Sequence, residues 1–345
     1  MTQEKNPMPE TPKKKHGKIP LIAGGIAALV LVSGYFVVQN QIADGAEDEV
    51  TRFLRDNQLD QAIRYRDLSA SLLGQSVTLH HVRMDFGDTH GTIEAITISD
   101  FERDERSGHL NSINLSIENA DFPIQPSRST WMRRASTPPP YLIGIDALKG
   151  DFGLNYEYDN VDGKLETSID FKLPTLIEGN VNVNVGNINL PPIDRISPNN
   201  FDRMRKLLVD AGKANLQATT LTVTDLGLED KIAEYMSVKN GAALDATTYR
   251  DRMYQELSTQ IERNPPRNAF ESHIAEIAKS ALHSSGGTLS LAYEPEYPTT
   301  FEDISSGMFS LMMGGFGAFG QNATKHGEVF EDLFDREVLQ IEFDS

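Results

Sequence analysis

The chain has 345 residues, of which 39% are hydrophobic and 24% charged, a composition typical of a globular protein with a sizeable core. It contains no cysteine, which excludes disulfides, thiolate metal sites and cysteine nucleophiles. The net charge of −18 repels phosphate backbones at long range and argues against nucleic acid as a partner.

An uncharged apolar stretch occupies residues 19–38. At about 1.5 Å per residue, a helix of that length crosses the roughly 30 Å hydrocarbon core of a bilayer. Lysines precede the stretch and acidic residues follow it, so residues 1–18 are predicted to be a cytoplasmic tail and the chain beyond residue 38 to be periplasmic, at a bacterial inner membrane. The predicted anchor residues are Ile19, Leu21, Val30, Tyr35, Phe36 and Val38.

A cleaved signal peptide is the alternative interpretation, with Ala43 and Gly45 as the small residues before a cut at Ala46. The apolar stretch exceeds the roughly 7 to 15 residues usual in a signal peptide, and Tyr35 and Phe36 are typical of an interfacial anchor. The pattern therefore favours an uncleaved signal-anchor.

Residues 39–136 are expected to form a juxtamembrane helix and a β subdomain. Val50, Phe53 and Leu54 have helical spacing within 47–59, and the period then changes to two, as at 77–79 and 113–117. A proline-rich break separates this part from residues 141–345, predicted to be a β-meander followed by a mixed α/β region. Its clearest unit is a hairpin over 152–173 that turns at Asp162-Gly163.

Further strands are expected at 181–190, 221–223, 289–293 and 339–343, and helices at 201–211, 228–236, 247–263 and 269–283. Strands outnumber helices without βαβ alternation. The predicted fold class is α+β, an antiparallel β-rich exported domain with a helical C-terminal half, preceded by one transmembrane helix.

The sequence offers little evidence for catalysis or cofactor binding. Residues 315–320 match the dinucleotide pattern GxGxxG, but no buried strand is predicted directly before them. His80 and His81 are neighbours on a strand and point to opposite faces, and His273 with Glu276 supplies only two ligands. The serine-hydrolase and zinc-protease motifs are missing. We therefore predict no catalytic, cofactor-binding or metal-binding residue.

A flexible apolar segment, rich in Met, Phe and Gly, covers residues 308–319. Its expected role is contact with lipid or a protein partner, because Met and Phe give an adaptable apolar surface; a turn packed in the core is the alternative. The candidate contact residues are Met308, Phe309, Met312, Met313, Phe316 and Phe319.

The layout from Lys13 to Met84, with the strand pair IRYRDLSASLLGQSVTLHHVRM, resembles AsmA-like envelope proteins. The resemblance implies long antiparallel sheets whose concave apolar face carries lipid. It leads us to expect a membrane-anchored periplasmic protein, not an enzyme, that binds lipid or an envelope protein; an envelope hydrolase with dispersed acidic residues is the alternative. The predicted helices between residues 228 and 283 depart from a purely β-structured family member.

Overall fold

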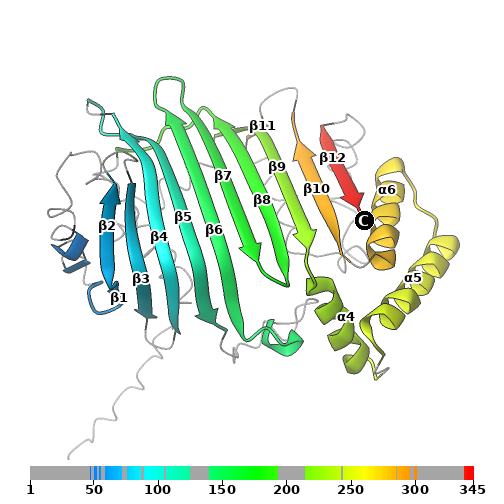
Figure 1. Cartoon of the computed structure of the whole chain (residues 1–345). Coiled ribbons are helices and arrows are strands. Elements are labelled where there is room, and N and C mark those ends of the chain that lie inside the picture. The colour runs from blue at the N-terminus through cyan, green and yellow to red at the C-terminus, as the bar shows by residue number, and fades with distance from the viewer. Residues whose placement is uncertain are drawn as a thin grey trace, which may run out of the picture.

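The computed structural model describes residues 47, 50–52, 54–55, 59–71, 76–86, 89–104, 106–124, 140–192, 214–241, 244–284, 286–295, 299–300 and 338–345. Within these residues, all strands belong to one antiparallel sheet with the order β1-β3-β4-β5-β6-β7-β8-β9-β10-β12, to which β2 is added beside β3 and β11 beside β9 (Figure 1).

The strands of the first half are β1 (Ile63–Arg64), β2 (Asp67–Ser71), β3 (Ser76–Phe86), β4 (Thr89–Arg103), β5 (Leu110–Pro123) and β6 (Ala147–Asp159). Those of the second half are β7 (Lys164–Leu173), β8 (Ile177–Gly186), β9 (Asn215–Asp225), β10 (Gly287–Tyr293), β11 (Thr299–Thr300) and β12 (Leu339–Asp344). The predicted hairpin about Asp162-Gly163 is confirmed as β6 and β7, because Asp159 pairs with Lys164.

Three helices are inserted between β9 and β10: α4 (Leu228–Lys239), α5 (Ala246–Arg263) and α6 (Ala269–His283). Side-chain caps fix two of their starts, since Asp245 accepts a hydrogen bond from the backbone N–H of Thr248 at 2.9 Å and Asn268 accepts one from Glu271 at 2.7 Å. A short 3-10 helix, η2 (Pro140–Ile143), precedes β6. The predicted helices at 228–236, 247–263 and 269–283 are thus confirmed, with α4 longer than expected.

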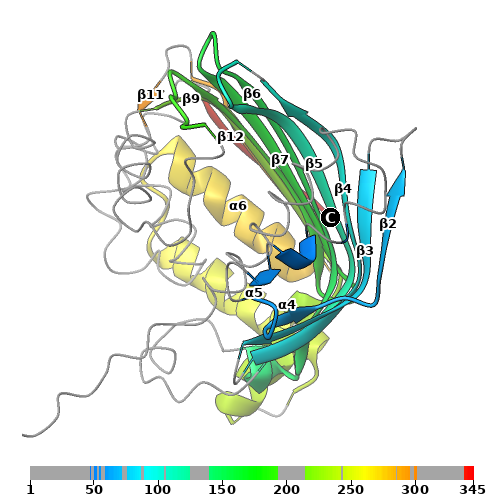
Figure 2. The same ribbon diagram turned by 90° about the vertical axis from the view of Figure 1, so that its left-hand side faces the viewer.

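The sheet is strongly curved, and the helices lie on its concave side (Figure 2). Left-handed residues within the strands contribute to the bend: His81 in β3 has φ 51° and Asn119 in β5 has φ 50°. Each reverses the alternation of side chains, so that Val77 and Leu79 before His81 and Val82 after it are all buried. The interruptions therefore bend the sheet while keeping apolar side chains on one face.

Two apolar cores lie at opposite ends of the concave face. At the β1–β5 end, Val50 and Leu54 of the first helical residues pack on the strands and are 1% and 4% exposed. At the β9–β12 end, Phe270 and Ile277 of α6 pack on the sheet. A small third cluster joins α4 to α5 through Ala233, Ala246 and Tyr249.

The predicted fold class is wrong in two respects: the proportion of helix to strand in the C-terminal half, and the transmembrane helix at its start. Within its described residues the structure is mostly antiparallel sheet with few helices, because the C-terminal half supplies β8–β12 to the same sheet and its helices form one insertion. The strands predicted at 181–190, 221–223 and 289–293 pair with one another as β8, β9 and β10 of this sheet, which the sequence pattern did not show because strand pairing depends on distant partners.

The membrane assignment, with the signal-anchor, is also corrected: across the described ranges, no helix combines the length and apolar character needed to cross a bilayer. The predicted segment 19–38, with Ile19 and Val38 at its ends, lies outside the described residues. So do the helix expected at 201–211 and the GxGxxG match at 315–320.

Candidate functional site

Apolar side chains form continuous rows across the concave face, because the strand register aligns them. One row crosses nine strands and consists of Val77, Ile98, Leu115, Leu154, Ile169, Val181, Leu221, Leu291 and Ile341. The next row consists of Leu79, Ile96, Ile117, Phe152, Phe171, Gly179, Val223, Leu289 and Phe343. Neither row contains a charged residue.

Burial along the first row is highest at its ends and lowest near its centre. Ile98 is fully buried and Ile341 is 5% exposed, whereas Ile169 on β7 is 41% exposed. Leu154 and Val181, its two cross-strand partners, are half-buried. The helical covers at the two ends of the sheet therefore leave the middle of the apolar face accessible.

We call this middle part the open sector and define it by the accessible apolar side chains of β6–β9. It consists of Phe152, Leu154, Ile169, Phe171, Val181, Leu221 and Val223. Along the strands it is bounded at one side by buried Tyr158 and Val185 and at the other by buried Leu176. Exposed apolar surface of this kind marks binding sites more often than isolated exposed residues do.

Gly179 shapes the floor of the open sector. It pairs with Phe171, and a Cβ at Gly179 would lie 2.7 Å from Phe171 Cζ and against the backbone carbonyl of Thr222. The missing side chain lets the phenyl ring cover the backbone of β8. The result is a flat aromatic floor rather than a ridge of side chains.

A row of hydroxyl groups lies next to the two apolar rows. Tyr156 pairs with Thr167, Thr167 with Val183, and Val183 with Thr219. Burial raises the pKa of Tyr156, with a smaller contribution from Tyr158. At neutral pH this row is therefore polar but uncharged.

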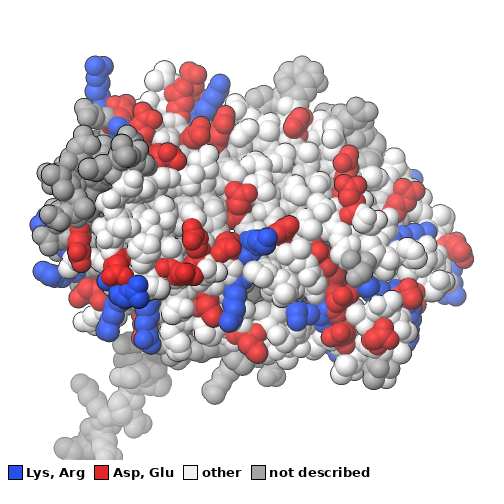
Figure 3. Space-filling model, viewed as in Figure 1, with Lys and Arg blue, Asp and Glu red and all other residues white. Residues whose placement is uncertain are grey.

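The convex face is polar and carries charged groups (Figure 3). Lys172 pairs with Glu178 at 3.3 Å, and the Asn180 amide donates to Asp170 at 2.7 Å and to Ser168 at 3.1 Å. These side chains bond to one another across the strands. Among the described strands β6–β9 the two faces are thus chemically opposite, with the apolar side chains on the concave one.

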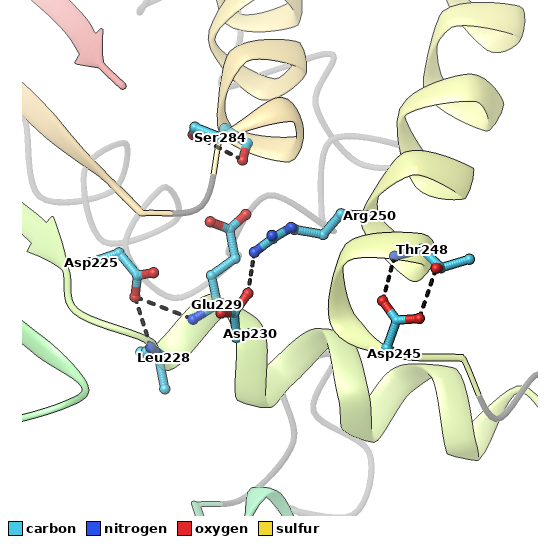
Figure 4. A network of polar contacts seen from close by, with 9 residues as sticks. Asp225, Leu228, Glu229, Asp230, Asp245, Thr248, Arg250 and Ser284 are labelled. Carbon is cyan, nitrogen blue, oxygen red and sulfur yellow. Dashed lines mark hydrogen bonds and ion pairs between the residues drawn. The ribbon is translucent and has the colours of Figure 1, made fainter.

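A polar cluster at the start of the helical insertion is the second candidate site (Figure 4). One Asp225 oxygen accepts hydrogen bonds from the backbone N–H groups of Leu228 at 2.8 Å and Glu229 at 3.2 Å. Arg250 of α5, 6% exposed, pairs with Asp230. The Glu229 side chain lies between the Asp225 carboxylate and the Arg250 guanidinium in this view.

Glu229 has a perturbed acidity. Burial raises its pKa to about 7, the negative charges of Asp225 and Asp230 act in the same direction, and Arg250 opposes them. A carboxyl with such a pKa is a candidate general acid or base. Here, however, Asp225 caps α4 and Asp230 pairs with Arg250, so the neighbouring carboxylates are engaged in holding the insertion together.

A polar cavity of about 480 Å³ lies beside α5 and is lined by Gln255, Glu256, Thr259, Gln260, Arg263 and Asn264. All six of these side chains are on the exposed side of α5. None of them belongs to the open sector or to the Glu229 cluster. The cavity is therefore separate from both candidate sites.

The sequence-predicted contact and anchor residues lie outside the described part of the chain. This holds for Met308, Phe309, Met312, Met313, Phe316 and Phe319, and for Ile19, Leu21, Val30, Tyr35, Phe36 and Val38. His80 is within hydrogen-bond distance of Ser69 (3.1 Å), and His273 contacts the backbone carbonyl of Ile341 on the edge strand β12. Within the described residues no group of His, Asp and Glu has the arrangement of a metal site.

Sequence reasoning missed the open sector as a site, although it predicted most of its strands. The alternation of Leu154 and Ile169 indicated two half-buried strands, but an apolar strand face is normally covered by the core. The signal that could have found it is the shortage of predicted helices in front of so many strands.

No protein-family model matches this sequence, and no curated protein is significantly similar to it.

Proposed function

We propose that this protein binds a lipid, with the hydrocarbon chain lying on the open sector, and that it is not an enzyme. The observation that carries the proposal is the exposure of Ile169, 41%, in the middle of an uncharged apolar row whose ends are buried. Removing that surface from water by a hydrocarbon ligand is favourable by roughly 25 cal/mol per Å².

The size of the open sector favours lipid over a protein partner. Four strands about 4.8 Å apart make it roughly 19 Å wide, and its two apolar rows with the hydroxyl row cover about 14 Å along the strands. An area on the order of 300 Å² is well below the roughly 800 Å² that each partner contributes to a stable protein interface. One acyl chain spans about half of the 30 Å hydrocarbon core, or roughly 15 Å, and fits that width.

The resemblance to AsmA-like proteins leads to the same proposal, since that group is associated with lipid carried on a concave sheet face. A place in the bacterial envelope stays a prediction, because the described residues contain nothing that bears on it. An envelope protein as partner is the alternative that the area estimate disfavours.

A hydrolase is the second candidate, and one observation favours it. Glu229 has a pKa of about 7 and lies near the carboxylates of Asp225 and Asp230. Catalysis by this cluster requires a substrate to reach Glu229. The polar cavity beside α5 is lined by other residues, so the lipid-binding proposal has the stronger support.

The proposal is tested by purifying the full chain from its expression host and quantifying co-purified lipid by native and denaturing mass spectrometry. We expect about one lipid per chain, and a reduction of about tenfold in Ile169→Asp, because a carboxylate in the apolar row costs at least the 1.4 kcal/mol that this factor requires. Ser168→Asp is the matched control, since it places the same charge on the same strand but on the convex face. Equal lipid content in both variants and wild type, or lipid-free wild type, contradicts the proposal.

A further inference from the structure

The edge of the open sector carries three hydroxyl groups in register. Tyr156 on β6, Thr167 on β7 and Thr219 on β9 belong to one cross-strand row, with Val183 of β8 between the two threonines. Neighbouring positions in such a row are about 5 Å apart. The three hydroxyls therefore lie in one row parallel to the apolar rows. The row extends from β6 to β9, as the open sector does.

These hydroxyls have no hydrogen-bond partner among the described residues, in contrast to nearby groups of the same kind. Tyr158, one alternation further along β6, donates to the carbonyl of Ile188 at 3.2 Å. On the convex face Thr224 and Thr288 bond to each other at 2.9 Å. Thr219 is 7% exposed as a residue, and its hydroxyl is not among the fully buried atoms that lack a partner in the described part of the chain, so it keeps some accessible surface.

The chemistry of a complementary group follows from what surrounds the row. Hydroxyls both donate and accept hydrogen bonds, and the rows of the open sector contain no Asp, Glu, Lys, Arg or His. A charged headgroup placed there has no counter-ion and loses its hydration. An ester carbonyl or an alcohol finds donors and acceptors without that cost.

We propose that the ligand is a neutral amphiphile whose ester or hydroxyl group, next to its hydrocarbon chain, is bound by the neighbouring hydroxyls of Tyr156 and Thr167. This inference rests on the proposed lipid binding and specifies the ligand class: acylglycerol-like lipids rather than free fatty acids or cationic amphiphiles. The hydrocarbon chain of the ligand lies along the row that contains Ile169, and the polar group of the ligand lies on the neighbouring row that contains Thr167.

The test measures binding of three soluble probes of equal chain length to the full chain by isothermal titration calorimetry. The probes are monodecanoylglycerol, decanoate and decyltrimethylammonium. We expect wild type to bind monodecanoylglycerol at least about tenfold more tightly than either charged probe, because a charged headgroup on this row loses hydration without gaining a counter-ion. The double variant Tyr156→Phe, Thr167→Val is expected to bind monodecanoylglycerol about tenfold more weakly than wild type does. Its affinity for decanoate is expected to change by less than about twofold.

Thr222→Val is the matched control, because Thr222 occupies the convex face of β9. It is expected to leave all three affinities unchanged. If wild type binds all probes equally, or if the double variant weakens all probes alike, the inference on ligand class is overturned while lipid binding stands. If no probe binds wild type, the proposed function fails as well.

Discussion

Ile98 and Ile169 lie in the same cross-strand row, three strands apart, yet Ile98 is 0% exposed and Ile169 is 41% exposed. The two residues have the same side chain, the same β conformation and the same face of the sheet. They differ only in what lies in front of them: the first helical residues and the neighbouring strands bury Ile98, whereas Ile169 belongs to the open sector.

This pair gives the first prediction, on stability. Ile98→Ala is expected to lower the free energy of unfolding by about 2 to 5 kcal/mol, the usual cost of truncating a fully buried isoleucine. Ile169→Ala is expected to cost less than about 1.5 kcal/mol, because a large part of its side chain is already in water. Urea unfolding followed by circular dichroism measures both. Equal losses for the two variants would show that the open sector is covered in solution.

Gly179 gives the second prediction. Gly179→Ala places a Cβ against Phe171 Cζ and the backbone carbonyl of Thr222, and we expect a loss of about 1 to 3 kcal/mol from overpacking. The combination with Phe171→Leu is expected to recover part of this loss, because removing the ring frees one of the two contacts. Gly241→Ala is the comparison for alanine at an exposed glycine, although φ there is 72° and adds its own strain. A Gly179→Ala variant as stable as wild type would contradict the described aromatic floor.

The alternation of apolar residues sufficed to predict the individual strands that form the open sector. Leu154, Ile169 and Val181 each lie in a segment with period two, and the Asp162-Gly163 turn set the register of the first two. The continuity of the row across β9, β10 and β12 was beyond sequence reasoning, since Leu221 and Leu291 are paired only because the helical insertion returns the chain to the same place.

The polar parts of the candidate sites were harder to predict for a different reason. Glu229 and Arg250 lie on different helices, and a linear reading of 50 acidic residues gives no sign of which ones are buried together. Tyr156 and Thr167 were visible as members of alternating strands, but their lack of hydrogen-bond partners is a property of the folded sheet. Tertiary context thus decided both polar features.

Arg250 gives the third prediction. Its guanidinium is 6% exposed, pairs with Asp230 and lies near Glu229. Arg250→Met keeps much of the side-chain volume but removes the only positive charge that the structure places against these carboxylates within its described residues, and we expect a loss of about 1 to 3 kcal/mol. Arg252→Met is the matched control on the same helix, because its pair with Glu256 is exposed and worth little. Thermal unfolding compares the two, and similar shifts would contradict a structural role for Arg250.

Glu229 gives the fourth prediction, on pH dependence. Burial raises its pKa from 4.5 to about 7, so that the folded state holds a proton that the unfolded state releases. Stability must therefore fall as pH rises from about 5 to about 7 and stay reduced above that range. Glu229→Gln mimics the protonated form and is expected to flatten this dependence, with its stabilising effect largest above pH ~7 and smallest near pH ~5.

The measurement for Glu229 is the melting temperature of wild type and variant across that pH range at constant ionic strength. Glu234→Gln is the control, since Glu234 is an exposed residue of the same helix. A direct value comes from the pH titration of the Glu229 carboxyl by carbon-13 NMR, which is expected to have its midpoint near pH ~7. A midpoint near pH ~4.5, with identical pH profiles for wild type and Glu229→Gln, would mean that the cluster of Asp225, Glu229 and Asp230 is open to water. Neither the predicted pH dependence of stability nor a hydrolase built on this cluster would then be supported.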